Sequence, residues 1–530
     1  MGAQVGRIMA YWMQRTGSEN SAEAILPTPS RVRIVVLLPA LICLAFGGFI
    51  QGQIYLNHDV AWVLSSSERL LAGGTFGHDI VAANPPLIWW ISALVAGLAN
   101  GLGLDPILML RLAVLALTAV VLVVMERNLR QSTGHAAMSG LLALLALLFT
   151  LGVHRDFAQR EHLSVLLCLP WLVVSMRRAD DLTQSRCLAV VAGVAAGIGI
   201  AFKPHFLAVP ALVWLYMTLH RRSLRPALGV ETFALLLTGI GYILAVWLFA
   251  RPYLTEVIPQ ITQVYWGFEY SLENVIRTHS FVIAMGFVAC IVAFVFGTHS
   301  LPRLTSLAGL GFLIAALAQS KGYSYHFYPV LAFAIISLAF SALTAGARMR
   351  RLLSAALLVA GLIFSTLQAG PSLAYRAMNG AYGQVTTCLV GLTEANVPVG
   401  GGFMAISTHP YPGFPVANYS HRRWVAATNS RLFLPAILRL NGLPELTVNQ
   451  AQTLALAETA ERAAILKDLS HRPALVLLDA RPHRHAIEAS DIDFLTFYDV
   501  DPAFDQIWQS YQEIHSCAPG IRAFTLSEGN

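Results

Sequence analysis

The sequence predicts a polytopic α-helical membrane protein that carries a small α/β domain at its C-terminus. Of its 530 residues, 56% are hydrophobic and 12% are charged. Soluble domains contain about 25% charged residues, so a chain this poor in charge cannot cover itself with a polar surface. Apolar runs of the length that a bilayer requires recur up to residue 370. Runs this long and continuous predict spanning helices and exclude a β-barrel.

The apolar segments predict about 11–13 transmembrane helices by their length. They lie near residues 34–53, 86–104, 107–126, 137–153, 162–177, 187–201, 205–220, 228–250, 279–297, 303–318, 327–345 and 352–369. Arginines concentrate in short connections between them, and arginine-rich connections face the cytoplasm. These cytoplasmic residues are Arg31, Arg33, Arg127, Arg130, Arg177, Arg178, Arg221, Arg222, Arg303, Arg348, Arg350 and Arg351.

This assignment places the loops 54–85, 154–161, 251–278 and 320–326 on the outer side, together with everything after residue 370. It also requires segments 86–104 and 107–126 to make a single net crossing. One of the two segments lies along the interface or is re-entrant, or else Arg127 and Arg130 break the rule.

Three regions follow: a cytoplasmic segment 1–33, a transmembrane catalytic domain 34–370 with the outward loop 54–85, and a periplasmic α/β domain 371–530. The first 30 residues are polar and dotted with arginine, so no cleavable signal peptide is predicted. In the last region, residues 402–408, 474–480 and 522–526 look like strands and 451–469 like a helix. Cys388 and Cys517 either pair there or remain two free thiols.

Ionisable residues at membrane edges are the informative ones, because burying them in lipid costs a few kcal/mol each. The first outward loop contains Asn57-His58-Asp59, an amphipathic stretch 60–72, and Asn84-Pro85-Pro86 before the next apolar run. Paired prolines suit a helix start. These residues are either functional or part of an ordinary solvated loop.

A second group runs from His154 to His162 and contains Arg155, Asp156, Arg160 and Glu161. It can bind an anion, or its charges can simply neutralise one another.

The chain has three lysines, and two of them, Lys203 and Lys321, end otherwise uncharged helices on the outer side. A compact ammonium suits a phosphate. Snorkelling to the interface is the alternative, and it explains one such lysine more easily than two. Tyr323, Tyr325 and His326 follow Lys321 directly.

In this order, the groups resemble the protein O-mannosyltransferase family and its bacterial lipid A aminoarabinose-transferase branch, which have the GT-C fold. The resemblance covers most of residues 34–345. It rests on Asp59, Leu70-Leu71-Ala72-Gly73-Gly74, Pro85-Pro86-Leu87, Arg111, an acid at Glu161 or Asp156, residues 197–203 ending in Lys203, and Ser320-Lys321-Gly322-Tyr323. Two positions depart from the pattern: Val60 replaces the usual Glu, and Asn84 replaces the Lys of the aminoarabinose branch.

The resemblance implies an inverting glycosyltransferase of the inner membrane of a bacterium. It would move a sugar from a polyprenyl-phosphate carrier to an extracytoplasmic acceptor, either lipid A, an envelope polysaccharide or a protein. Asp59 would be the base, its pKa raised by burial, and Glu161 or Asp156 would orient a basic residue or bind the acceptor. The carrier phosphate and sugar would be held by Lys203, Lys321, Arg111, Arg155, Arg160, His58, Asn84, Tyr323, Tyr325 and His326.

The expected partners are therefore the lipid-linked sugar donor, a lipid or polysaccharide acceptor, and the bilayer itself, with no nucleic acid. No cofactor is predicted. The histidines and acids are close enough to make a divalent metal possible, but the resemblance does not require one. Two other functions fit the same residues: a transporter or flippase for a lipid-linked sugar, which predicts inverted repeats or broken helices, and a non-catalytic scaffold.

Overall fold

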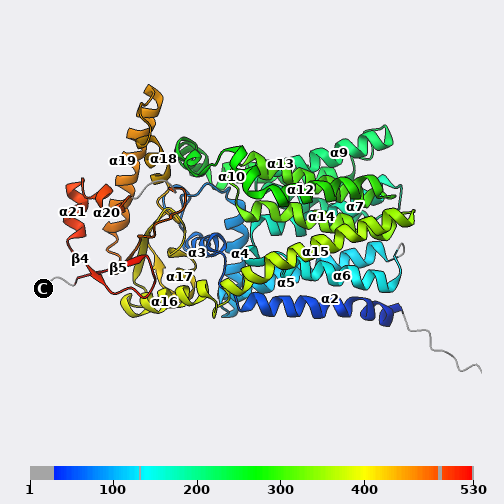
Figure 1. Ribbon diagram of the computed structural model, residues 1–530, viewed down its shortest axis with the longest axis horizontal. Helices are drawn as coiled ribbons and strands as arrows, with labels where there is room; N and C mark the ends of the chain where they lie inside the picture. The colour runs from blue at the N-terminus through cyan, green and yellow to red at the C-terminus, as the bar shows by residue number, and fades with distance from the viewer. Residues whose placement is uncertain (1–28, 131–132, 488–491, 528–530) are drawn as a thin grey trace, which may run out of the picture.

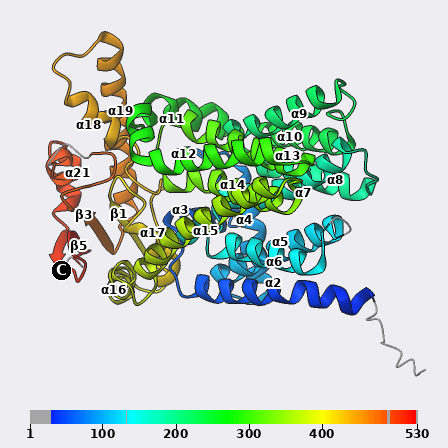
Figure 2. The same ribbon diagram turned by 45° about the vertical axis from the view of Figure 1, so that its right-hand side comes forward.

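The computed structural model describes residues 29–130, 133–487 and 492–527, and it is a long helical bundle with a mixed α/β domain packed on one end (Figures 1 and 2). Residues 1–28, most of the predicted cytoplasmic segment, lie outside the described residues. Among those described, seven helices are long and apolar enough to cross a membrane. Several leave large apolar side chains exposed, such as Leu237, Ile243 and Phe249. The predicted fold class, a polytopic helical membrane protein with a small C-terminal α/β domain, is confirmed.

Within the part of the chain that the structure describes, twelve helices form the bundle, one for each predicted apolar segment. They are α2 (Pro29–Gly52), α4 (Leu87–Leu102), α5 (Pro106–Leu129), α6 (His135–Thr150), α7 (Arg160–Ala179), α8 (Arg186–Ala201), α9 (Ala208–Arg221), α10 (Val230–Phe249), α12 (Leu272–Phe296), α13 (Ser300–Ala318), α14 (Ser324–Thr344) and α15 (Arg348–Arg376). Shorter elements connect them: α3 (His58–Leu71), η1 (His154–Asp156), η2 (Pro204–Leu207), η3 (Tyr253–Val257), α11 (Ile258–Val264) and η4 (Tyr265–Phe268).

Polar contacts fix the direction of these helices at the bundle end that lies away from the domain, here called the opposite end. Arg33 at the start of α2 pairs with Glu126 at the end of α5 at 3.0 Å. Arg178 at the end of α7 pairs with Glu231 at the start of α10 at 2.5 Å, and Asp181 pairs with Arg221 at the end of α9. Arg177 also donates to the carbonyl of Asn128, which joins the end of α7 to the end of α5. The predicted cytoplasmic arginines in these three ion pairs therefore share one end, as the positive-inside pattern requires.

The same contacts decide the path of α4. Because α5 finishes at the opposite end, it begins at the end that carries the C-terminal domain, here called the domain end. The helix α4 starts beside the domain-end residues Asn84 and Pro85 and ends at Leu102, so that three residues separate it from Pro106. Both of its ends therefore lie at the domain end, and its ribbon runs across the direction of the long helices (Figure 1). Segment 107–126 alone makes the crossing, and Arg127 and Arg130 obey the rule.

Helix α7 is the buried centre of the bundle, and nearly all of its residues are inaccessible. It is surrounded by α5, α8, α13 and α14. Since other helices shield it from lipid, it can begin with the polar residues Arg160, Glu161 and His162 without exposing them to hydrocarbon.

The C-terminal domain contains one five-stranded sheet with helices around it. Its elements are α16 (Ala381–Asn396), β1 (Gly402–Ile406), α17 (Gly413–Ser420), β2 (Arg423–Trp424), α18 (Leu434–Asn441), α19 (Val448–Ser470), β3 (Leu475–Asp479), α20 (Phe494–Tyr498), α21 (Pro502–Trp508), β4 (Tyr511–Ile514) and β5 (Ile521–Leu526). The strand order is β2-β1-β3-β5-β4. The strands β2, β1 and β3 are parallel, and β5 is antiparallel to β3 and β4. The three predicted strands are β1, β3 and β5, and the predicted helix is α19.

The domain is fastened to the first outward loop. Arg69 of α3 donates to the carbonyls of Trp424 and Ala426, and Asn418 of α17 donates to the carbonyl of Ala61 at 3.0 Å. Both partners of each bond are partly or fully buried. These bonds therefore hold the C-terminal domain against α3.

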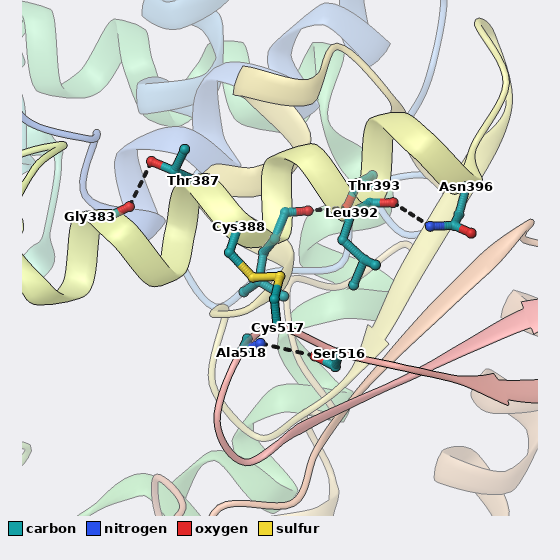
Figure 3. The surroundings of a disulfide bond; sticks show 10 residues. Gly383, Thr387, Cys388, Leu392, Thr393, Asn396, Ser516, Cys517 and Ala518 are labelled. Carbon is teal, nitrogen blue, oxygen red and sulfur yellow. Dashed lines mark hydrogen bonds between the residues drawn. A yellow bond between two sulfur atoms is a disulfide. The ribbon is translucent and has the colours of Figure 1, made fainter.

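A disulfide joins Cys388 of α16 to Cys517 in the connection between β4 and β5 (Figure 3), with the two Cα atoms 6.1 Å apart. The pairing spans 129 residues of sequence. It therefore ties the helix that follows the last membrane span to the far edge of the sheet, and the two cysteines are not free thiols.

Candidate functional site

A cavity of about 1050 Å³ lies between the domain end of the bundle and the C-terminal domain. Eleven of the thirteen predicted site residues line it, although they come from distant parts of the chain. They are His58, Asp59, Asn84, Arg155, Asp156, Arg160, Lys203, Lys321, Tyr323, Tyr325 and His326. The outward loops fold together here because the helix directions bring all of them to the domain end.

The carboxylate of Asp59 is held by a chain of side-chain amides. Asn57 caps α3: its Oδ1 accepts from the backbone N–H of Asp59 at 2.9 Å. The same oxygen accepts from Gln159 Nε2 at 3.1 Å, and this nitrogen also donates to Asp59 Oδ2 at 3.3 Å. Asn57 Nδ2 donates to Asp156 Oδ1 at 3.0 Å. Asp156 therefore fixes the orientation of Asn57, and Asn57 with Gln159 fixes that of Asp59.

The pKa values of the two aspartates differ from the sequence-based expectation. Burial would raise the pKa of Asp59, but His58, Arg160 and the hydrogen bond from Gln159 outweigh it and hold the pKa below its usual value. The expectation of a raised pKa for Asp59 is therefore wrong. The raised value belongs to Asp156, where burial dominates over nearby Arg155 and lifts the pKa to about 6.

Lys203 is engaged by neighbouring side chains. Its Nζ lies 2.6 Å from Glu161 Oε1 and donates to Gln319 Oε1 at 2.8 Å. It also lies 3.1 Å from His326 Nε2. Burial lowers the pKa of Lys203 to about 8, and Glu161 limits this decrease. The charge of Lys203 is thus largely balanced by Glu161, which lies behind the cavity wall rather than in the lining.

Two other cations facing the cavity, Arg160 and Lys321, have no carboxylate within 4 Å among the described residues, although Glu161 and Asp59 act on Arg160 and Glu269 acts on Lys321 from farther away. Arg160 is 4% exposed, and its Nη1 has no hydrogen-bond partner among the described residues. The Nζ of Lys321 lies 3.1 Å from the ring centre of Tyr265, a cation–π contact. Burial and the neighbouring Lys203 lower the pKa of Lys321 to about 7. A buried cation without a carboxylate partner is costly unless an anion joins it.

Arg155 and the segment after Lys321 complete the bundle side of the cavity. Arg155 Nε lies 3.8 Å from Asp156 Oδ1, and its Nη2 donates to the hydroxyl of Ser324 at 2.9 Å. Tyr323 and Tyr325 pack against each other with ring centres 5.5 Å apart. These two hydroxyl-bearing side chains line the same cavity as Arg160 and Lys321.

The structure does not bring Arg111 into the cavity. Its guanidinium donates to the carbonyl of Ile54 at 2.5 Å and to the hydroxyl of Tyr419 at 3.2 Å. It fastens the C-terminal domain to the end of α2, and a contact with the carrier phosphate is not supported.

The sequence-based prediction missed the residues that the C-terminal domain supplies. Thr408, His409, Asn429, Ser430 and His485 line the cavity from that side. The ring of His409 lies 4.3 Å from that of His58 and 5.3 Å from that of His485, measured between ring centres. The sequence held one partial signal, since His409 directly follows the predicted strand 402–408.

A second, narrower cavity of about 120 Å³ meets the first at Asp59 and Arg160. Its other walls are almost entirely apolar and come from α3, α4, α5 and α7, including Val63, Ile91 and Leu117. The charged centre therefore borders an apolar groove. Over the described residues, no group of three or more His, Cys, Asp or Glu side chains is arranged to hold a metal ion.

Comparison with solved structures shows the fold. The chain superposes on ArnT from Cupriavidus metallidurans, solved bound to undecaprenyl phosphate, with a TM-score of 0.54 and 12% identity, over 95% of this chain and 100% of that one. This likeness confirms the predicted GT-C-like fold.

Two further solved structures are similar at lower scores. The arabinofuranosyltransferase AftD from Mycobacteria aligns at a TM-score of 0.44 and 14% identity, over 94% of this chain and 42% of that one. The oligosaccharyltransferase AglB from Archaeoglobus fulgidus was solved in complex with an inhibitory peptide and a dolichol-phosphate. It aligns at a TM-score of 0.43 and 12% identity, over 92% of this chain and 74% of that one. No protein-family model matches the chain, and no curated protein sequence is significantly similar to it.

Proposed function

We propose that this protein is an inverting glycosyltransferase that moves a sugar from a polyprenyl-phosphate carrier to an extracytoplasmic acceptor. The observation that carries the proposal is the convergence of Asp59 with Arg160 and Lys321, two cations that form no close ion pair among the described residues, in one cavity at the domain end. A carboxylate and a phosphate-binding pair are the two parts that such a transfer needs.

A lipid carrier fits the surroundings of this centre. The apolar groove between α3, α4, α5 and α7 ends at Asp59 and Arg160, so a phosphate held by Arg160 can extend a hydrocarbon chain away from the polar cavity. ArnT, which shares this fold, was solved bound to undecaprenyl phosphate, and this supports a polyprenyl phosphate as the carrier.

The orientation follows from two independent features. The arginines of the opposite end face the cytoplasm by the positive-inside rule, and the Cys388–Cys517 disulfide belongs in an oxidising compartment. Both support a periplasmic location for the cavity and the domain 371–530, in the inner membrane of a bacterium.

In the proposed reaction, Asp59 Oδ1 or Oδ2 takes the proton of an acceptor hydroxyl as its oxygen attacks the anomeric carbon. The bond from that carbon to the carrier phosphate oxygen breaks, and its electron pair leaves with the polyprenyl phosphate. Arg160 and Lys321 stabilise the charge that develops on the phosphate. Attack from the side opposite the phosphate inverts the anomeric centre. Asn57 and Gln159 keep the Asp59 carboxylate directed into the cavity.

The test is transfer from a panel of labelled polyprenyl-phosphate sugars by the purified full-length protein. We expect Asp59→Asn to abolish transfer while undecaprenyl phosphate still binds. Glu68→Gln, on the exposed face of the same helix, is the matched control and should retain activity. Full activity of Asp59→Asn would show that Asp59 is not the catalytic base. Translocation of the intact donor without cleavage would show that the protein is a transporter instead.

A further inference from the structure

The part of the C-terminal domain that faces the cavity is the carboxyl edge of its parallel strands. Thr408 and His409 follow β1, Asn429 and Ser430 follow β2, and His485 follows β3. The loops at the carboxyl ends of neighbouring parallel strands converge on one crevice, and open α/β sheets bind their ligands there. The edge of the sheet at which such domains bind ligands therefore faces the cavity that contains Asp59 and Arg160.

His409 is held in one orientation and one tautomer at this edge. Its backbone N–H donates to Ser407 Oγ at 3.1 Å, and that hydroxyl donates to Asp479 Oδ2 at 3.0 Å. Its Nδ1 accepts from the backbone N–H of Tyr411 at 3.0 Å, so Nε2 carries the proton and is a donor. Burial holds the pKa of His409 well below its usual value, so the ring is neutral at neutral pH.

The two sides of the cavity differ in charge. None of the described lining residues from the domain is Asp, Glu, Lys or Arg. Behind the edge, Arg481 binds both oxygens of Asp479 at 2.8 Å, and Arg431 binds Glu461 and Asp468. The nearby guanidinium of Arg376 lies over the ring of Tyr382 and is not part of the cavity lining. The bundle side, in contrast, presents charged side chains, which are Asp59, Arg155, Asp156, Arg160, Lys203, Glu269 and Lys321.

We propose that the carboxyl edge of this sheet is the acceptor subsite, and that the acceptor is an uncharged, hydroxyl-rich glycan rather than a phosphorylated lipid. Imidazole, amide and hydroxyl groups exchange hydrogen bonds with sugar hydroxyls at little desolvation cost. A phosphate on the acceptor would be desolvated against an edge that offers it no cation. The inference rests on the proposed function, since it divides the same cavity into a carrier half and an acceptor half.

The experiment measures glycan binding to the full-length protein in nanodiscs with undecaprenyl phosphate at saturation, so that the carrier half is occupied. The probes are neutral hexasaccharides of glucose, mannose, galactose and arabinose, each compared with the same hexasaccharide bearing one phosphate monoester. We expect at least one neutral probe to bind and its phosphorylated form to bind about tenfold more weakly or worse. Binding of no neutral probe, or equal or tighter binding of the phosphorylated forms, overturns the proposal.

Variants locate the glycan. His409→Ala should weaken binding of the neutral probe about tenfold, the usual effect of removing one buried hydrogen-bonding partner. His409→Gln keeps an N–H donor and should recover part of the lost affinity. His483→Ala, an exposed histidine in the same loop as His485, is the control and should change nothing. Unchanged glycan affinity in His409→Ala refutes the placement. Carrier affinity is measured separately, so a wild-type protein that fails to bind undecaprenyl phosphate contradicts the proposed function and not this subsite.

Discussion

The titration of Lys321 offers the sharpest test of the phosphate site. Its pKa of about 7 follows from burial beside Lys203, and its ammonium contacts the ring of Tyr265 rather than a carboxylate. A bound phosphate would hold the proton on Lys321, so binding takes up protons and affinity falls as the pH rises above the pKa of the free protein.

The magnitude follows from that pKa. A group with a pKa of about 7 is about half protonated at pH 7 and about one-hundredth protonated at pH 9, so affinity should fall about fiftyfold over this range. The carrier phosphate itself changes charge near pH 6, and measurements from pH 7 upward avoid that transition.

The comparison that isolates Lys321 is with Lys321→Arg, because an arginine stays charged throughout. Lys203, whose pKa is about 8, titrates in both proteins and cancels in the ratio of their affinities. Undecaprenyl phosphate binding would be measured by fluorescence titration in detergent micelles at pH 7, 8 and 9. The ratio of the wild-type affinity to the Lys321→Arg affinity should fall between pH 7 and pH 9. A change in this ratio of less than about threefold refutes the contact between Lys321 and the phosphate.

Three further predictions concern the aspartates and the disulfide. Asp59→Asn should reduce transfer at least about a hundredfold, the usual contribution of a general base, and leave carrier affinity within about twofold. Because the pKa of Asp156 is raised to about 6, its contribution to stability is present below its unfolded value of 3.8 and is lost as the pH rises through about 6. Thermal unfolding from pH 4 to 8 should therefore show the wild type losing about 3 kcal/mol that Asp156→Asn retains, and parallel curves would contradict the assignment. Cys388→Ser should lower the free energy of unfolding of the C-terminal domain by up to about 5 kcal/mol, given the 129-residue separation, as measured by pulse proteolysis; an unchanged value would show that contacts alone hold the domain.

The membrane part was largely predictable because lipid penalises polar residues and makes them conspicuous. Asp59, Arg160 and Lys203 stand out in the sequence since a charge at a membrane edge needs a reason. The path of α4 could not be predicted, because the positive-inside rule assigns sides only to connections and its own connection to α5 carries no arginine. It took the Arg33–Glu126 pair, formed by residues 93 positions apart, to orient α5.

The side of the cavity that the C-terminal domain forms could not be predicted, for the opposite reason. In a water-exposed domain a histidine carries no such penalty, so His409 and His485 look ordinary in the sequence. The pKa of Asp59 was mispredicted because, although its neighbour His58 opposes the effect of burial most, two of the other opposing groups, Arg160 and Gln159, lie about 100 residues away in the sequence. Likewise, the Lys203–Glu161 pair became visible only when α7 and the end of α8 met.

The charges around the cavity indicate which species the site favours. Of the four cations on the bundle side, Lys203 is paired with Glu161 and Arg155 lies near Asp156, whereas Arg160 and Lys321 have no carboxylate within 4 Å among the described residues. A donor with its sugar attached is a phosphodiester with one negative charge, and the carrier released by transfer is a monoester with a charge of about −1.5 to −2 at neutral pH. Two cations without a close ion pair match the second species better than the first. In the reaction that we propose, Lys321, about half protonated at pH 7 in the free protein, would gain its full charge as the phosphate gains its own. The site would then stabilise the departing carrier more than the bound donor, and only such a difference accelerates bond cleavage.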